Sequence, residues 1–115
     1  MLLKVIEQCK TVTGTVMAVK REKDGDYHIR VKLDSGQENL LNEKNIQVQH
    51  GCLVLEIICG CEVTQKDAIE PCQGYVNNVR VPEKGEHVQV TGSYVYDAEH
   101  GWMEIHPVTK IVLID

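Results

Sequence analysis

The stretch that decides the fold is Asp24-Gly-Asp-Tyr-His-Ile-Arg-Val-Lys-Leu-Asp34. The pair Asp-Gly at its start is a strong signal for the tight turn of a β-hairpin. After this turn, apolar and polar residues alternate from Tyr27 to Asp34. In a strand such alternation buries one face and exposes the other, and the exposed face carries Arg30 and Lys32. The stretch therefore predicts a half-buried strand that pairs with the chain before the turn.

The predicted partner of this strand is Thr11–Val19. It is rich in β-branched residues, which pack well on a pleated surface, and Gly14 within it permits a bulge or a sharp bend. Residues 1–10 are too short and too charged for a signal peptide, and we expect them to form a lead segment. A length of 115 residues suits a single domain, which we place at 11–115.

The chain after the hairpin first predicts a loop and then a central strand. Ser35–Gly51 is polar and reads as a loop. Cys52–Cys59 is a nearly continuous apolar run, which is typical of a strand covered on both faces. Glu56 interrupts this run, and its carboxylate needs a partner if it is buried.

One short helix and two further strands are predicted in the second half of the chain. The pattern at Thr64–Asp67 resembles a capping box, and Pro71 requires the helix that it opens to be short. The fourth strand is expected at Glu86–Asp97. The fifth is expected at Trp102–His106, and it resumes after Pro107.

This order of elements predicts a mainly β protein that forms a single five-stranded barrel of the oligonucleotide/oligosaccharide-binding (OB) type. An OB barrel needs one short helix between strands 3 and 4, which is where the capping pattern lies. An SH3-like barrel or a small sandwich, the competing all-β folds, does not predict a helix at that place.

Charge and composition restrict the classes of partner. The formal net charge is −5, whereas a non-specific nucleic-acid binder usually carries a basic surplus, so charge alone gives a nucleic-acid partner no support. No stretch approaches the roughly 18 apolar residues that span a bilayer, so we expect no membrane partner. The compartment stays open between the cytoplasm and an exported domain trimmed to its mature form.

Five cysteines are many for this length, and their state has three possible readings. Cys52 and Cys59 can be small buried apolar residues of a strand. Cys72 can form a disulfide with Cys59 or Cys61. These last three can also bind zinc, although they lack the paired C-x2-C spacing of most zinc sites.

The segment Tyr94–Pro107 carries most of the chemically useful residues, including the only tryptophan of the chain. In a strand that begins at Trp102, alternate residues share a face, so Met103 and Ile105 turn to the core. The opposite face then lies beside the preceding turn. We expect a polar site there, made of Asp97, His100, Trp102, Glu104 and His106.

The same segment resembles a known family. The pattern Gly-x-x-Val-x-Val-Thr-Gly-x-Tyr-Val-x-Asp-x-x-His-Gly-Trp-x-Glu-Ile-His-Pro-Val at Gly85–Val108 is similar to small prokaryotic domains that are regarded as OB-like and have no established activity. Residues 53–59, 63–68 and 72–75 also resemble that family, so the likeness covers roughly the second half of the chain. It implies the OB-like fold, and it implies that Cys59 and Cys72 are the paired cysteines.

The first functional hypothesis is a binding module for single-stranded nucleic acid or another polar ligand. OB barrels stack bases on aromatic side chains and follow the backbone with basic ones. Tyr94 and Tyr96 share a face with core valines and can equally be core residues. The candidate ligand-binding residues are Arg30, Lys32, Tyr75, Asp97, His100, Trp102, Glu104 and His106.

The second hypothesis is a divalent-metal site, with hydrolysis as its possible chemistry. His100, Glu104 and His106 offer two imidazoles and a carboxylate, a donor set that zinc accepts, and Asp97 or Glu56 can orient a ligand. A third hypothesis is a protein-interaction domain. No nucleophile elbow, phosphate-binding glycine loop or dinucleotide motif is present in the sequence, which favours a binding protein over an enzyme.

Overall fold

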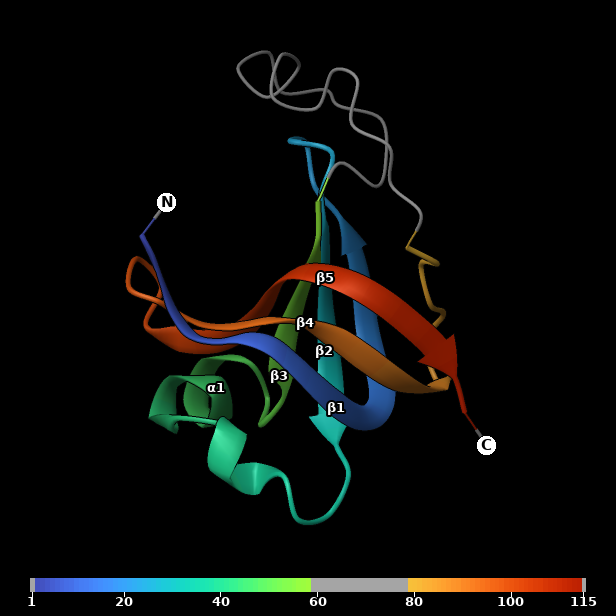
Figure 1. The fold of residues 1–115 in the computed structure, drawn as a ribbon, viewed down its shortest axis with the longest axis horizontal. Coiled ribbons are helices and arrows are strands. Elements are labelled where there is room, and N and C mark those ends of the chain that lie inside the picture. The colour runs from blue at the N-terminus through green and yellow to red at the C-terminus, as the bar shows by residue number, and fades with distance from the viewer. Residues whose placement is uncertain (1, 59–78, 115) are drawn as a thin grey trace.

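The computed structural model describes residues 2–58 and 79–114. The elements in these ranges are β1 (Leu3–Arg21), β2 (Tyr27–Leu33), the 3-10 helix η1 (Glu38–Leu40), α1 (Glu43–Val48), β3 (Leu53–Ile57), β4 (His87–Asp97) and β5 (Trp102–Leu113) (Figure 1). The predicted helix at Thr64–Glu70 lies outside the described residues, as do Tyr75 and the proposed disulfide of Cys59 and Cys72.

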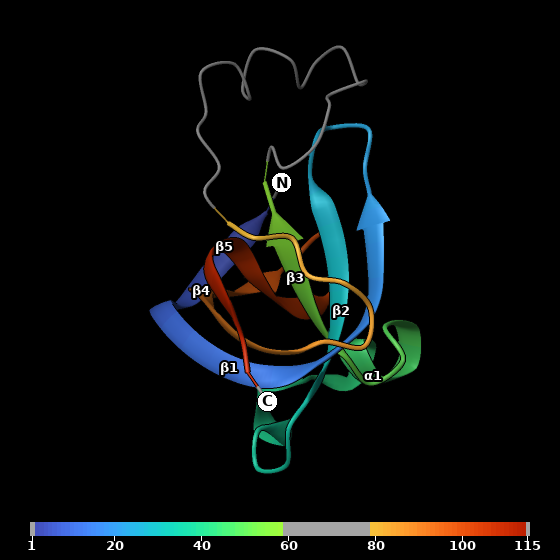
Figure 2. The ribbon, with the colours of Figure 1, turned by 90° about the vertical axis from the view of Figure 1, so that its right-hand side faces the viewer.

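The five strands form one mixed sheet that closes into a ring. Their order is β1-β2-β3-β5-β4, and β4 pairs with β1 to complete the circle. All neighbours are antiparallel except β3 and β5, which are parallel. Figure 2 shows β1 curving around the sheet from β4 to β2. The prediction of a mainly β protein with five strands is confirmed.

Strand β1 is long because it pairs with two different neighbours. Residues 3–15 pair with β4 and residues 14–21 pair with β2. The strand therefore includes most of the segment that the sequence set apart as a lead. Gly14 belongs to both pairings, and a Cβ atom there would overlap the backbone carbonyl of Lys32. The close approach of β2 at this bend thus requires a glycine.

The interior of the ring is filled by aliphatic side chains from every strand. Ile29 and Val31 of β2 are fully buried, as their alternation predicts. Tyr94 is also a core residue, since it is 7% exposed and its hydroxyl donates to the carbonyl of Leu40 at 2.6 Å. The reading as a core side chain is confirmed for Tyr94, whereas Tyr96 is only half-buried and lies outside the core cluster. Cys52 is buried just before β3, as the sequence suggested.

The expectation of a loop at 35–51 is wrong, because this segment forms η1 and α1. Helix α1 begins with a capping box made by two asparagines: Asn42 accepts from the backbone N–H of Asn45 at 3.1 Å, and the Asn45 side chain accepts from that of Asn42 at 3.2 Å. The short helix of the described ranges therefore lies between β2 and β3. No helix in these ranges is long and apolar enough to cross a membrane.

Strand β5 differs from the prediction in one respect. The sequence suggested a break around Pro107, but β5 continues from Trp102 to Leu113. The pairing of β4 with β5 shifts its register between Thr91 and Tyr94. This part of β4 faces the part of β5 that contains Pro107. The strand can thus pass a residue without a backbone N–H and still pair with β4 on either side.

Candidate functional site

A cavity of about 220 Å³ lies between the β1–β2 turn and the β4–β5 turn, over residues of β2, β3 and β5. Three imidazoles and the indole of Trp102 line it together with acidic side chains. The carboxylates are those of Glu22, Asp24, Asp26, Glu56, Asp97 and Glu104. We call this cavity the acidic cleft.

Strand β5 supplies one wall of the acidic cleft, in the way its alternation predicts. Glu104 is 2% exposed, and its two oxygens accept from two neighbours on the same face. Trp102 Nε1 donates to Oε2 at 2.6 Å, and His106 Nδ1 donates to Oε1 at 3.1 Å. Met103 and Ile105 pack on the core side. The expected row of an indole, a carboxylate and an imidazole is therefore present.

The β4–β5 turn adds Asp97 and His100. Asp97 accepts from the backbone N–H groups of Glu99 and His100 at 3.0 and 3.2 Å, and from His100 Nδ1 at 2.6 Å. Burial alone would raise the pKa of Asp97, but the hydrogen bonds from His100 and the interaction with Glu104 outweigh it and lower that pKa. The ring of His100 stacks on Trp102 with centroids 4.6 Å apart. The imidazole is thus held by a carboxylate at its edge and by an indole at its face.

The opposite wall comes from β2 and β3, and the sequence reasoning missed most of it. His28 lies directly opposite Glu56 in the β2–β3 register, and its Nδ1 donates to Glu56 Oε1 at 3.2 Å. That bond raises the pKa of His28 in spite of burial, and burial raises the pKa of Glu56. One signal of this wall was present in the sequence, because a buried Glu56 needs a partner.

His106 completes a set of three imidazoles that each donate through Nδ1 to a carboxylate. Burial alone would lower the pKa of His106, but the hydrogen bond to Glu104 and the nearby carboxylates of Glu56 and Asp26 raise it. Within the described ranges, Nε2 of His100 and Nε2 of His106 take part in no hydrogen bond. Histidines that ligate metals through one nitrogen commonly donate the other N–H to a carboxylate in this way.

Two groups of three donor atoms in the cleft lie within 4.8 Å of one another. One group comes from Glu22, His28 and Glu56, and the other from Asp97, His100 and Glu104. Of the predicted metal ligands, His100 and Glu104 belong to the second group, whereas His106 belongs to neither. Each oxygen of Glu104 accepts one hydrogen bond, which orients Trp102 and His106 and leaves each oxygen a further lone pair.

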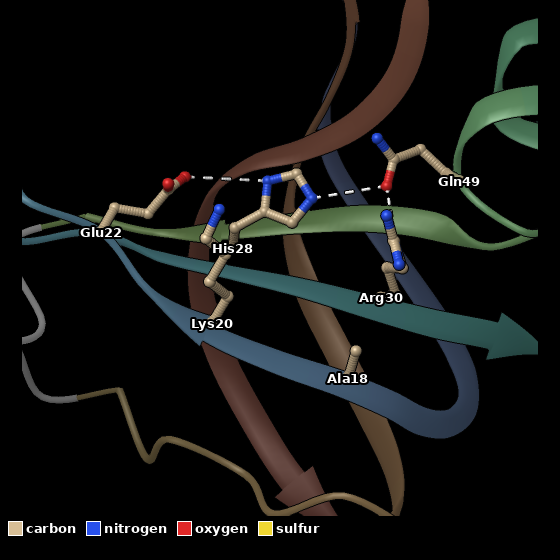
Figure 3. Close-up of a pocket in the computed structure, with 6 residues that line it drawn as sticks. All are labelled: Ala18, Lys20, Glu22, His28, Arg30 and Gln49. Carbon is tan, nitrogen blue, oxygen red and sulfur yellow. Dashed lines mark hydrogen bonds and ion pairs between the residues drawn. The ribbon is translucent and has the colours of Figure 1, made fainter.

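Arg30 and Lys32, which were predicted to share the site, lie in an adjoining hollow instead. Arg30 Nε donates to Gln49 Oε1 at 2.7 Å, and the same oxygen lies 3.5 Å from His28 Nε2. Figure 3 shows Gln49 between these two side chains. Of the eight candidate ligand residues, the structure brings together the five that belong to the β4–β5 hairpin. It places two beside them, and it does not describe Tyr75.

The carboxylate–histidine pairs predict that stability falls as pH rises in metal-free buffer. His28, His100 and His106 have pKa values above 6.5 in the folded protein, so their stabilisation is complete below pH 6.5 and is lost as pH rises through the folded values. The raised pKa of Glu56 acts in the same direction from pH 4.5 upward.

Asp97 sets the acid limit, because its lowered pKa gives stability above pH 3.8 that is lost as pH falls through the folded value. Urea unfolding between pH 3 and pH 9 measures the profile. A free energy of unfolding that rises steadily from pH 6 to pH 9 would contradict the pairing.

The chain matches no protein-family model, and a search of curated proteins finds no match to it.

Proposed function

We propose that the protein is an OB-like binding barrel whose acidic cleft binds a divalent metal ion. The ring order β1-β2-β3-β5-β4, with β3 and β5 parallel, supports the OB-like reading. OB barrels bind their ligands over strands 2 and 3, between the loops that join strands 1–2 and 4–5. The acidic cleft has this position. The resemblance of Gly85–Val108 to an OB-like family agrees with this reading.

One observation carries the metal proposal. His100 and His106 line the same cavity, and their Nδ1 atoms are fixed by the buried carboxylates of Asp97 and Glu104. This leaves Nε2 of each ring as a lone-pair donor. Imidazole is a preferred ligand of zinc, copper, iron and nickel. A divalent ion would also reduce the mutual repulsion of six carboxylates around one small cavity.

The described residues that line the cleft favour binding over covalent catalysis. They include no serine, threonine, cysteine or lysine nucleophile, and the carboxylates of Glu56, Asp97 and Glu104 are engaged by imidazoles. The carboxylates at the rim repel anions, which argues against a phosphate group as the direct occupant. The cleft therefore suits a cation, and its nitrogen donors select a first-row transition metal over Ca²⁺ or Mg²⁺, which prefer oxygen ligands.

Calorimetric titration of chelator-treated protein with Zn²⁺, Mn²⁺ and Ni²⁺ tests the proposal. We expect one saturable site for at least one of these ions, with a change in the fluorescence of Trp102. His106→Asn should weaken binding by more than about 100-fold. Glu104→Gln, which removes the orienting carboxylate, should weaken binding by about 10- to 100-fold.

His87→Asn is the matched control, because His87 pairs with Asp34 at 2.7 Å outside the cleft. This variant should bind metal like the unmodified protein. Failure of the unmodified protein to take up any of the three ions would exclude the metal site, as would equal binding by folded His106→Asn.

A further inference from the structure

A second hollow adjoins the acidic cleft and carries the opposite charge. Two cavities of about 360 and 590 Å³ share Ala18 and Arg30 in their walls, so they form one groove along β1 and β2. Its cationic side chains are Lys20, Arg30 and Lys32, and its wall also includes Glu22 and His28, which line the acidic cleft as well. We call it the basic groove.

The β1–β2 register explains why the groove is open. Ala18 lies opposite Arg30, after an irregularity at Met17, so no large side chain of β1 faces the guanidinium. Arg30 and Lys32 are two residues apart on one face of β2, which separates their backbones by about 6.7 Å. Successive phosphates of an extended single strand have a similar spacing.

The three cations of the groove make no ion pair with a carboxylate in the described ranges. Arg30 is held in place through Nε by the buried Gln49, and its two terminal amino groups have no hydrogen-bond partner in the same ranges. Because a guanidinium only donates, the Gln49 atom that faces it must be the oxygen. The fork of Arg30 is therefore positioned to meet a pair of oxygens on a ligand.

We propose that the basic groove binds the phosphodiester backbone of a single-stranded nucleic acid over a few nucleotides. Met17 and Ala18 give the groove an apolar floor beside its cations. The net charge of −5 does not oppose this site, because six of the 17 acidic residues lie in the neighbouring cleft.

The neighbouring acidic cleft limits the length of the nucleic acid that the groove can bind. Its carboxylates repel phosphate at one end of the groove, so a duplex or a long strand is excluded there. The groove has no phenylalanine, tyrosine or tryptophan among the described residues that line it. Trp102 lies in the cleft with one face covered by His100, so it is not a stacking platform for this ligand. The affinity is therefore electrostatic, weak and independent of sequence.

Fluorescence anisotropy with labelled dT12 and rU12, in a chelating buffer that excludes any role of the metal site, tests the proposal. We expect saturable binding at low salt, with a log–log salt slope of about −2 for three phosphate contacts. The variant K20Q/R30Q/K32Q should lose this binding. The variant K4Q/K84Q/K110Q, which changes three exposed lysines outside the groove, has the same net charge and should keep it.

Four outcomes would overturn the proposal. The unmodified protein binds neither oligonucleotide, both triple variants lose binding equally, a 12-base-pair duplex binds as tightly as the single strands, or polyglutamate displaces the oligonucleotide at equal charge concentration. The last result would assign the groove to an acidic peptide. None of them depends on whether the cleft takes up a metal.

Discussion

Replacing Asn45 by alanine lowers the free energy of unfolding by about 3 kcal/mol or more. Asn45 is fully buried, and its side chain joins α1 to two distant segments. Nδ2 donates to the carbonyls of Cys52 and Met103, both at 3.0 Å, and Oδ1 accepts from the backbone N–H of Met103 at 2.8 Å. Alanine leaves these buried groups without partners, at a cost of about 1–3 kcal/mol for each one that water does not reach.

Chemical denaturation measures this loss, and Gln47→Ala is the control. Gln47 is on the same helix, but its amide is exposed and bonds only to Glu43 at 2.8 Å in the described ranges, so its loss should cost less than about 0.5 kcal/mol. A loss below 1 kcal/mol in Asn45→Ala would show that the bridge to β5 is unimportant. Because Met103 lies between Trp102 and Glu104, the variant should also hold metal less tightly.

Replacing Gly92 by alanine is the second change with a large expected effect, about 3 kcal/mol of destabilisation. A Cβ atom at this position would overlap the carbonyl oxygen of Pro107 and crowd the side chain of Ile105. The backbone of β5 cannot move away without disturbing the core, so the substitution overpacks the β4–β5 pairing. Thermal and urea unfolding of the purified variant give the size of the loss.

Gly36→Ala is the control, because it introduces backbone strain without the steric crowding that is expected at Gly92. Gly36 has a φ of +95° and nothing within 4 Å of its added Cβ, so alanine there measures only the left-handed conformation, about 1–2 kcal/mol. Gly92→Ala should exceed that value. Equal stability of Gly92→Ala and the unmodified protein would mean that β4 and β5 do not approach so closely.

Local periodicity was enough to predict most strands and one wall of the site. The alternation after the Asp-Gly turn placed Ile29 and Val31 in the core, and the alternation after Trp102 placed Glu104 and His106 on one polar face. Both inferences need only a period of two within one segment. Both inferences are confirmed, because β2 and β5 each turn one face to the core and the other away from it.

The remaining features depend on pairing between distant segments. His28 meets Glu56 through the β2–β3 register, which a single segment does not reveal. The first part of β1 is mostly exposed, and its strand conformation comes from pairing with β4. Helix α1 was missed because two asparagines form its capping box, whereas the usual sequence signal is a serine or threonine followed by an acidic residue.

The separation of Arg30 from the acidic cleft also could not be predicted from sequence. Its face of β2 was correctly expected to be polar, but His28 on the same face turns to the cleft while Arg30 turns to Gln49. His28 also lies 3.5 Å from Gln49 Oε1 and lines both hollows, whereas Arg30 lines the basic groove alone. The sequence showed Gln49 only as part of a polar stretch.

The parallel junction between β3 and β5 has a consequence for how the ring holds together. In the described ranges its register comprises only Val54 with Glu104 and Leu55 with Ile105, so it is the shortest of the five junctions. Glu56 and His106 stand on its two sides, and both line the acidic cleft. A ligand that contacts both residues would connect β3 with β5. Its binding free energy would then add to the free energy of unfolding of the whole ring.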